Sequence, residues 1–357
     1  MGAIDEMARI KEERELDLLE LPNVVGVGLG ARYVDGEPTD EPAIVVSVER
    51  KLPKSDLTDE AIVPARIEGI RTDVVQTGAF ELDQENWRAR RPLDAGAGIG
   101  VAHTGGDYST GTLGVFAMDA KNRLYGLTNN HVACVPTNVT GSIVHQPATV
   151  HGGSWKTDRI GWVNNAVPLA GGGAWNWADM ASIAIERIDL CTAVHPGIKR
   201  PLRGHYPGVG LNWQLWKVGA KTGYTQGWVR ATHHTMTSEY DGVKIILKDQ
   251  VMIRGEGGAR PSAGGDSGSV WATMDHYAAA LHAGSSPDGF AVAAHVGTVL
   301  GTWSLKVWSR SSRDGELVEG EMADSDEIVA RPDPRAIEDL RARTVSSEAP
   351  VEGAPAR

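Results

Sequence analysis

The sequence predicts a mainly β protein in which a small α/β unit precedes a larger all-β region. Two observations predict this division. Residues 98–308 contain many short runs of Val, Ile, Leu and Ala separated by Gly, Pro, Asn and Asp, which is typical of strands joined by turns. The same residues show almost no long helical period, and their number is sufficient for two small hydrophobic cores.

The first 78 residues predict the α/β unit. Within residues 1–20, apolar side chains recur at helical spacing among many charges, so we expect an amphipathic helix there. Its apolar members are Ile4, Met7, Ile10, Leu16 and Leu19. Residues 21–78 are expected to form the rest of a small α/β domain. Its expected elements are strands over 24–33, 43–49 and 71–76 and a helix over 59–65.

A glycine-rich stretch lies in the first of these strands. Residues 26–30 read Gly-Val-Gly-Leu-Gly, a pattern that also occurs in nucleotide-binding loops. Such a loop needs a helix directly after its strand. Here no helical pattern follows, and Asp35-Gly36 soon supplies a turn. We therefore expect a structural role for these glycines.

The rest of the chain divides at changes of composition. Residues 79–97, which include Arg88, Arg90, Arg91 and Pro92, are expected to form a linker. Strands of the all-β region are expected over 214–218, 227–232, 244–247 and 251–254. Residues 309–357 are acidic and poor in large apolar side chains, so we expect a flexible tail with one short helix over 333–343.

Composition excludes several classes of partner. The chain has 46 acidic and 35 basic residues and a net charge of −11, which makes nucleic acids and anionic membranes poor partners. No apolar run reaches the roughly twenty residues needed to span a bilayer. The N-terminus also lacks the basic and apolar segments of a secretory signal, so a cytoplasmic location is expected. The sequence leaves the oligomeric state open.

Metal sites and disulfides are not expected. Cys134 and Cys191 lack the regular spacing of a disulfide framework. Several histidine pairs occur, but none has a CxxC or HExxH arrangement. We expect neither a metal nor a cofactor.

The most informative stretch is Gly-Gly-Asp-Ser-Gly-Ser at 264–269. It places the hydroxyl of Ser267 in a glycine-rich loop. A serine attacks a carbonyl only when a base takes its proton and fixed donors receive the oxyanion. Because glycines let the backbone turn sharply, the N–H groups of Gly265 and Ser267 are candidates for these donors. A polar turn that arose by chance is the alternative, so the base has to be found elsewhere.

A histidine upstream can supply that base. Residues 124–132 predict a buried strand that ends in polar residues and carries His131. A third group, a carboxylate, must orient the imidazole. We choose Asp179, because it opens the alternating segment 179–185 and would be anchored where a strand begins. Asp189 is second, since it lies in a charged segment. The other candidates are Asp158, Glu186, Glu239, Asp241, Asp249 and Glu256.

With His131, Asp179 and Ser267 in this chain order, the sequence resembles the chymotrypsin/trypsin-like serine peptidases. Residues 127–131 are similar to the histidine block of that family, with Asn-Asn where animal members usually have Ala-Ala, and residues 179–181 and 265–269 are similar to its aspartate and serine blocks. Residues 217–227 resemble a K-x-G-x-x-T-G-x-T-x-G hairpin of bacterial members. Residues 110–114 resemble the first barrel strand of a bacterial subgroup with a small N-terminal domain.

The resemblance covers residues 98–308 and implies two six-stranded antiparallel barrels with the catalytic groups between them. It implies a serine endopeptidase that works through an acyl-enzyme on protein or peptide substrates. A catalytically silent binding or scaffold protein and an esterase with the same triad remain alternatives. Asp266 is expected to hold the nucleophile loop, and no activation site precedes residue 98. Val132 stands where many secreted relatives have a cystine, which favours a reducing compartment.

The resemblance also bears on the substrate. Residues 279–284 should form the strand that lines the specificity pocket, including His282 and Gly284. His282 follows Ser267 by fifteen residues, and Ser262 precedes Ser267 by five. In glutamyl endopeptidases these positions bind an acidic side chain, so the resemblance implies a preference for Glu or Asp before the scissile bond. The alternative is that His282 is a packed structural residue.

Overall fold

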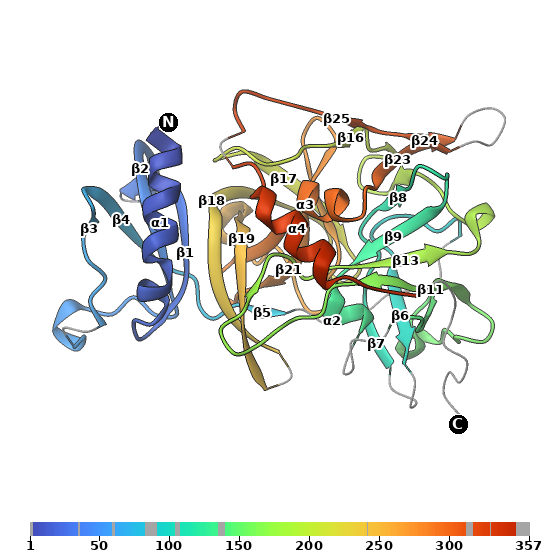
Figure 1. Cartoon of the computed structure of the whole chain (residues 1–357), viewed down its shortest axis with the longest axis horizontal. Helices are drawn as coiled ribbons and strands as arrows, with labels where there is room; N and C mark the ends of the chain where they lie inside the picture. Colours follow the sequence, from blue (N-terminus) through green and yellow to red (C-terminus); the bar gives the residue numbers. More distant parts are fainter. Residues whose placement is uncertain are drawn as a thin grey trace.

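Two antiparallel β barrels lie side by side, and a small α/β unit joins the outer side of one of them (Figure 1). The computed structural model describes residues 3–347, apart from 35, 59–60, 83–90, 104–107, 135–139, 241, 312–316 and 329. The mainly β architecture with a double barrel after an α/β unit confirms the fold class that the sequence predicts.

The first barrel has six strands when β7 and β8 are taken as one bent strand. Its strand order is β8-β9-β13-β11-β10-β6-β7. β7 and β8 act as one bent strand, because the Gly114 N–H donates to Leu127 O (2.8 Å) and the Leu127 N–H donates to Val115 O (2.9 Å) between them. The bounds are β6 (Gly98–Ala102), β7 (Tyr108–Thr112), β8 (Phe116–Met118), β9 (Leu124–Thr128), β10 (Ile143–His145), β11 (Arg159–Ala166) and β13 (Ala181–Ile185). Ile99, Leu113 and Ile160 are fully buried in its core.

The second barrel is a closed ring. Its strand order is β19-β22-β21-β20-β17-β18, and β18 pairs with β19 to close it. The bounds are β17 (Gln214–Gly219), β18 (Gly223–Tyr240), β19 (Val243–Gly255), β20 (Val270–Thr273), β21 (Tyr277–Ser285) and β22 (Phe290–His295). β19 merges two strands that we expected to be separate, with Asp249 at φ 59° between them. Trp271 and Leu215 are fully buried in this core.

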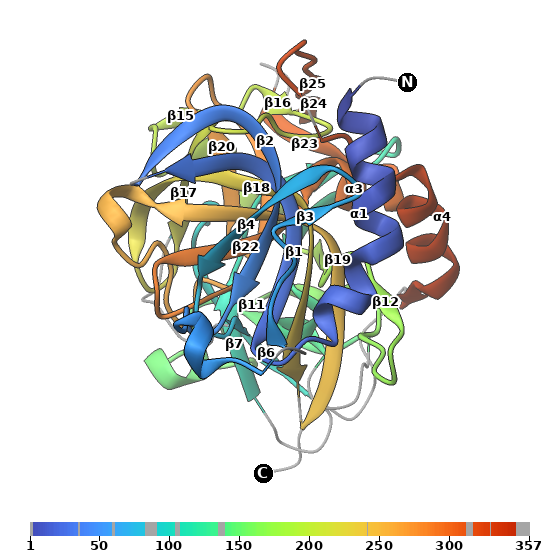
Figure 2. The ribbon, with the colours of Figure 1, turned by 90° about the vertical axis from the view of Figure 1, so that its left-hand side faces the viewer.

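The N-terminal unit extends the sheet of the second barrel. β1 pairs with β18, and β2 and β4 follow outward (Figure 2). The elements are α1 (Ala3–Leu19), β1 (Val24–Val34), β2 (Glu37–Val48), β3 (Arg66–Ile67) and β4 (Ile70–Gln76). Of the helix expected over 59–65, Ala61 belongs to a 3-10 turn, residues 62–65 are not helical, and residues 59–60 lie outside the described residues. The short turn η1 (Lys54–Asp56) precedes this segment.

The glycines of β1 permit the close approach of a histidine on β18. A Cβ atom at Gly26 would lie 2.3 Å from Cε1 of His234, and one at Gly28 would lie 3.0 Å from its Cδ2. The same ring is fully buried and lies 3.0 Å from Ser47 Oγ through Nε2. The glycine-rich stretch is therefore a packing surface.

A buried charge cluster attaches α1 to the second barrel. Glu15 is fully buried and pairs with Lys11 on the same helix. Its carboxylate also accepts from Thr235 Oγ1 (2.7 Å) and lies 3.1 Å from Lys248 Nζ. Because each charge has an opposite partner, the cluster can be buried between helix and barrel.

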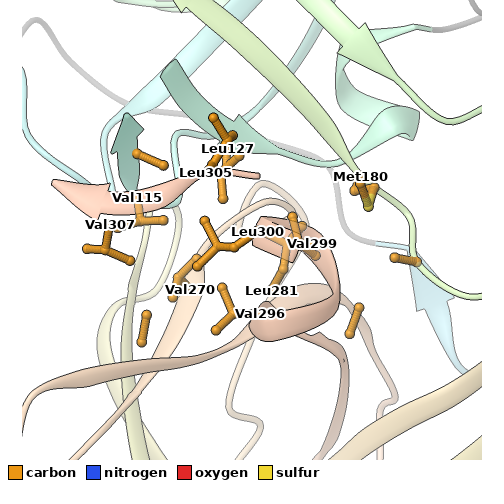
Figure 3. Packing of buried hydrophobic residues seen from close by; sticks show 14 of the residues in the cluster. Val115, Leu127, Met180, Val270, Leu281, Val296, Val299, Leu300, Leu305 and Val307 are labelled. Carbon is orange, nitrogen blue, oxygen red and sulfur yellow. The ribbon is translucent and has the colours of Figure 1, made fainter. Parts of the chain in front are cut away.

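Part of the segment expected to be a flexible tail, residues 334–343, is a helix packed on the protein. α4 (Pro334–Arg343) starts at the predicted place, where the Asp333 side chain accepts from the Arg335 N–H (2.9 Å). Leu340 and Ala336 are almost completely buried against α3 (Val296–Thr302) and the core between the barrels. Figure 3 shows that core, which includes Leu127 and Leu281. The expectation of a flexible tail is thus wrong for α4.

The expected linker 79–97 is built into the barrels at both of its described ends. Phe80 is 4% exposed, and the following strand β5 (Glu81–Leu82) pairs with β21. Leu93 is fully buried and forms a bridge with Cys191. Residues 83–90, including Arg88 and Arg90, lie outside the described residues. A simple spacer is therefore the wrong description of the described ends.

Short elements complete the fold. They are α2 (Asn130–Ala133), η3 (Thr149–His151), β12 (Trp175–Asn176), η4 (Ile188–Leu190), β14 (Val194–His195), β15 (Arg200–Pro201), β16 (Gly204–His205), η5 (Glu256–Gly258), β23 (Lys306–Ser311), β24 (Leu317–Glu319), β25 (Glu321–Met322) and β26 (Val345–Ser346). In the part of the chain that the structure describes, no helix has the length and apolar character needed to cross a bilayer.

Candidate active site

His131 and Asp179 form a buried pair at one end of the first barrel. His131 lies in α2 directly after β9, and Asp179 lies just before β13, the neighbour of β9 in the sheet. Nδ1 of His131 is hydrogen-bonded to Asp179 Oδ2, and the His131 backbone N–H donates to Oδ1 (3.1 Å). Asn129 Nδ2 donates to the Asp179 carbonyl (2.7 Å) and fixes the turn. The pair leaves Nε2 as the ring nitrogen that can take a proton.

The other carboxylates are less suited to this position. Asp189, our second choice, is exposed at the surface and forms a bidentate pair with Arg187 at 3.0 and 2.9 Å. Asp249 pairs with His233 Nδ1 (2.6 Å) on the opposite side of the second barrel's hairpin. Asp241 lies outside the described residues. Among the described candidates, Asp179 is the one hydrogen-bonded to His131.

The loop of Ser267 packs against the first barrel beside His131. The Ser267 carbonyl accepts from the Thr112 N–H of β7 (2.8 Å). A Cβ atom at Gly111 would lie 3.1 Å from that carbonyl and 2.5 Å from Cγ2 of Val132. Gly111 therefore lies between the Ser267 carbonyl and Val132, a residue of the helix that carries His131, and has room for no side chain. The Ser267 hydroxyl lies 3.5 Å from the Ala283 carbonyl of β21.

The glycines shape this loop as we expected. Gly265 has a φ of 107° and Gly268 a φ of 89°, values that favour glycine. Thr112 Oγ1 donates to the Gly265 carbonyl (2.6 Å) and holds the peptide in place. The N–H groups of Asp266, Gly268 and Ser269 donate within the protein. The Gly265 N–H donates to no acceptor among the described residues, which leaves it available to an oxyanion.

Asp266 anchors the loop through a buried ion pair. Lys217 Nζ lies 2.8 Å from Asp266 Oδ2, and both side chains are fully buried. The carboxylate also accepts from Thr222 Oγ1 (2.5 Å) and from the backbone N–H groups of Lys221 and Thr222. A Cβ atom at Gly219 would lie 2.2 Å from Asp266 Oδ1, so glycine is needed for this approach.

Electrostatics favours the charged form of Asp266. Burial by itself would raise the pKa of this carboxyl, but the charge of Lys217 and the hydrogen bonds from Lys217 and Thr222 outweigh it and lower the pKa to about 2. The carboxylate therefore remains ionised at neutral pH and holds the loop of Ser267 through these hydrogen bonds.

The expected pocket residues also meet. His282 and Ser262 are fully buried, and Nε2 of His282 lies 2.6 Å from Ser262 Oγ. Trp271 Nε1 lies 3.4 Å from Nδ1 of His282. Because an indole N–H can only donate, Nδ1 accepts and the hydrogen of the neutral ring sits on Nε2. Gly284 follows two residues later on the same strand, opposite Val292 of β22.

Several supporting residues were missed by the sequence reasoning. Lys217 and Thr222 were recognised as part of a hairpin motif, but their contact with Asp266 was not predicted. The signal was the spacing of Lys217, Gly219 and Thr222 in that motif. Trp271, which orients His282, stands four residues after Ser267 and carries no separate signal.

Other reactive groups do not assemble into a second centre. Among the described residues, no three His, Cys, Asp or Glu side chains are placed to hold a metal ion. The thiol of Cys134 is buried and that of Cys191 is half-buried. Burial raises the pKa of each thiol to about 12, which disfavours a nucleophilic thiolate.

Comparisons with known proteins give two kinds of similarity. Residues 6–76 match the family model of the NARROW LEAF 1 N-terminal domain, and no curated protein matches the chain. Similar solved structures are serine proteases. A glutamic acid-specific serine protease described as using a histidine triad in substrate binding is 18% identical, with 60% of this chain and 100% of that chain covered and a TM-score of 0.44.

Two further structures are similar to the same extent. Thermobifida fusca protease A is 17% identical, with 64% of this chain and 99% of that chain covered and a TM-score of 0.42. Cellulomonas bogoriensis chymotrypsin is 16% identical, with 61% of this chain and 98% of that chain covered and a TM-score of 0.43.

Proposed function

We propose that this protein is a serine endopeptidase in which Ser267 is the nucleophile, His131 the base and Asp179 the orienting carboxylate. The observation that carries the proposal is the buried hydrogen bond of His131 Nδ1 to Asp179, next to the Ser267 loop at the junction of the barrels. A scaffold has no physical need for this combination of nucleophile, base and carboxylate.

The proposed reaction follows from this arrangement. His131 Nε2 takes the proton of Ser267 as Oγ attacks the peptide carbonyl, and the N–H groups of Gly265 and Ser267 receive the oxyanion. The imidazolium then protonates the departing amine, which leaves an acyl-enzyme. Water, deprotonated by the same nitrogen, hydrolyses this ester and releases the carboxylic acid. Asp179 accepts the hydrogen bond from Nδ1 and stabilises the imidazolium in both halves.

We also propose that the residue before the scissile bond is Glu or Asp. His282 and Ser262 supply polar hydrogens in an otherwise buried environment. Since the Trp271 N–H faces Nδ1, Nε2–H of His282 donates to Ser262 Oγ, and the Ser262 hydroxyl in turn donates to the substrate carboxylate. Arg260 adds positive charge nearby, with Nη2 lying 3.5 Å from Ser285 Oγ.

Hydrolysis of a diverse peptide library, read by mass spectrometry, tests the reaction. We expect cleavage by the wild type and loss of at least about a thousandfold of kcat with Ser267→Ala or Asp179→Asn. Parallel assays with p-nitrophenyl esters separate the esterase alternative, because an esterase would lose ester hydrolysis in these variants while never cleaving peptides. Absence of both activities from the wild type and also from a folded variant in which β5 no longer pairs with β21 would contradict the proposal.

The specificity proposal has a separate test in the same library. Cleavage should follow Glu or Asp, and His282→Ala should remove this preference with the triad intact. Ser262→Ala should weaken it less, because the imidazole remains. Equal cleavage after basic or apolar residues in the wild type would show that His282 is a packed structural residue.

A further inference from the structure

Three segments of the chain follow one another along a single edge of β21. β20 pairs with residues up to Leu281. The nucleophile loop comes next, because the Gly268 N–H donates to His282 O (3.1 Å) and the His282 N–H donates to Ser269 O (2.8 Å). The Ser267 hydroxyl then approaches the Ala283 carbonyl.

β5 holds the next two positions on that edge. Leu82 lies opposite Gly284 and Glu81 opposite Ser285, in antiparallel register. The other edge of β21 at these positions is taken by β22. β5 is therefore the immediate neighbour of the Ser267 loop along the strand.

An extended peptide bound for cleavage needs this same place. Its carbonyl must reach Ser267, and adding a strand to an exposed sheet edge is a general way to hold an extended peptide. The part of the β21 edge that such a peptide would use begins at Gly284, where β5 now lies. A peptide paired there would run past the nucleophile in the antiparallel direction, which is the direction in which β5 runs.

The segment before β5 is firmly attached. Phe80 is buried beside Ala283 in a core of the second barrel, and its carbonyl accepts from Ser238 Oγ (3.2 Å). Its ring lies edge-on to His234 at 5.8 Å. Correspondingly, Ser267 and His131 are only 0% and 1% exposed. A triad that must meet a peptide is thus closed to solvent.

We propose that β5 is a built-in occupant of the substrate-binding edge, so that a substrate peptide binds at Gly284 and Ser285 only after β5 leaves. This inference rests on the proposed peptidase function, because the edge is a substrate-binding edge only if Ser267 attacks a bound peptide. Phe80 anchors the strand, and the two strand positions 81 and 82 compete with peptide ligands for the same backbone groups.

Binding in the inactive Ser267→Ala background tests this. The probe is a fluorescein-labelled peptide with the sequence of residues 79–90, followed by fluorescence polarisation. Glu81→Pro/Leu82→Pro removes the amide donors of β5, whereas the matched Glu81→Ala/Leu82→Ala keeps them. We expect the proline variant to bind the peptide roughly tenfold tighter than the alanine variant, the change expected for a lost strand hydrogen bond. A scrambled peptide should bind neither.

A second variant covers the case in which the prolines disturb folding. Glu81→Cys/Ser285→Cys, also with Ser267→Ala, places two thiols opposite each other in the register. The oxidised form should not bind the peptide, and reduction should restore binding. Equal affinity of the proline and alanine variants, or equal binding before and after reduction, would overturn the proposal.

Failure of the peptidase proposal can be told apart from this result. The binding measurements contain no nucleophile and do not depend on hydrolysis. If the proline variant with Ser267 restored cleaves no peptide while the Ser267→Ala form binds the probe, the occupied edge is supported and the peptidase function is not.

Discussion

At the scale of single residues, the site depends on polar groups that are buried in pairs. His131 is oriented by Asp179, Asp266 is held by Lys217, and His282 is oriented by Trp271. A buried charge is tolerated only with its partner, since taking it out of water is costly. Removing one member of the Lys217–Asp266 pair should therefore destabilise the protein, although neither residue belongs to the proposed triad.

Lys217→Met tests this dependence. The substitution leaves Asp266 buried without its cation, so we expect the free energy of unfolding to fall by about 3–5 kcal/mol. The nucleophile loop should also lose its fixed conformation, which lowers the rate of peptide hydrolysis. Urea unfolding and kcat/KM measure the two effects. Lys221→Met is the matched control, because the hydrogen bond that Lys221 donates to Asp266 comes from its backbone N–H (2.8 Å), which the substitution keeps. Equal effects of the two substitutions would contradict the role of the Lys217–Asp266 pair.

At the scale of elements, contacts between distant segments decide what local patterns leave open. α4 has a clear start signal in Asp333 and Pro334, and its position was predicted. Its docking on α3 was not, because the apolar face of a short helix does not reveal its partner. The cost of removing a side chain from that face measures how firmly α4 is docked.

Leu340→Ala measures this docking. Leu340 is fully buried in the core between the barrels, so we expect a loss of about 2–5 kcal/mol in unfolding free energy. Leu16→Ala on α1 is the control, since Leu16 is 45% exposed. A change at Leu340 as small as that at Leu16 would mean that α4 is loosely attached in solution.

The same distinction explains how much the sequence could predict. β1 and β4 were anticipated within a few residues, because their apolar patterns are local. The break expected in β19 is absent, since Asp249 adopts a left-handed backbone that lets the strand continue. The pairings of β5 with β21 and of Lys217 with Asp266 join segments far apart in the chain, so a local pattern does not identify the partner. Ser267 was chosen from its glycine-rich loop and His131 and Asp179 from predicted strand ends, and their catalytic roles remain proposals.

At the scale of the whole molecule, five buried histidines link folding to pH. Burial lowers the pKa of His195 and His234 from 6.5 to about 3 and that of His145, His205 and His295 to about 4. The unfolded chain therefore binds more protons than the folded chain once the pH falls below about 6.5. The stabilising effect is complete above that pH and is lost as the pH falls towards the folded values.

Acid should therefore destabilise the protein well above the range in which carboxylates titrate. Each histidine removes up to about 1.4 kcal/mol of unfolding free energy per pH unit below 6.5. Urea unfolding at a series of pH values measures the slope. The centroid of the His195 imidazole lies 4.9 Å from that of Trp216, and His195→Phe keeps a ring in this place. The substitution should reduce the dependence of unfolding free energy on pH by the contribution of one histidine, up to about 1.4 kcal/mol per pH unit. A stability that stays constant from about pH 7 to 5 would exclude this linkage.

The central claim is that Ser267 is an activated nucleophile. Labelling with a fluorophosphonate, followed by mass spectrometry of the modified peptide, tests it most directly. The proline variant of β5 is labelled in parallel, so that an occupied edge cannot hide a competent triad. The account predicts a single phosphonate on Ser267 in both proteins, faster in the proline variant, and none with Ser267→Ala or His131→Ala. No adduct at Ser267 in either folded protein would contradict it.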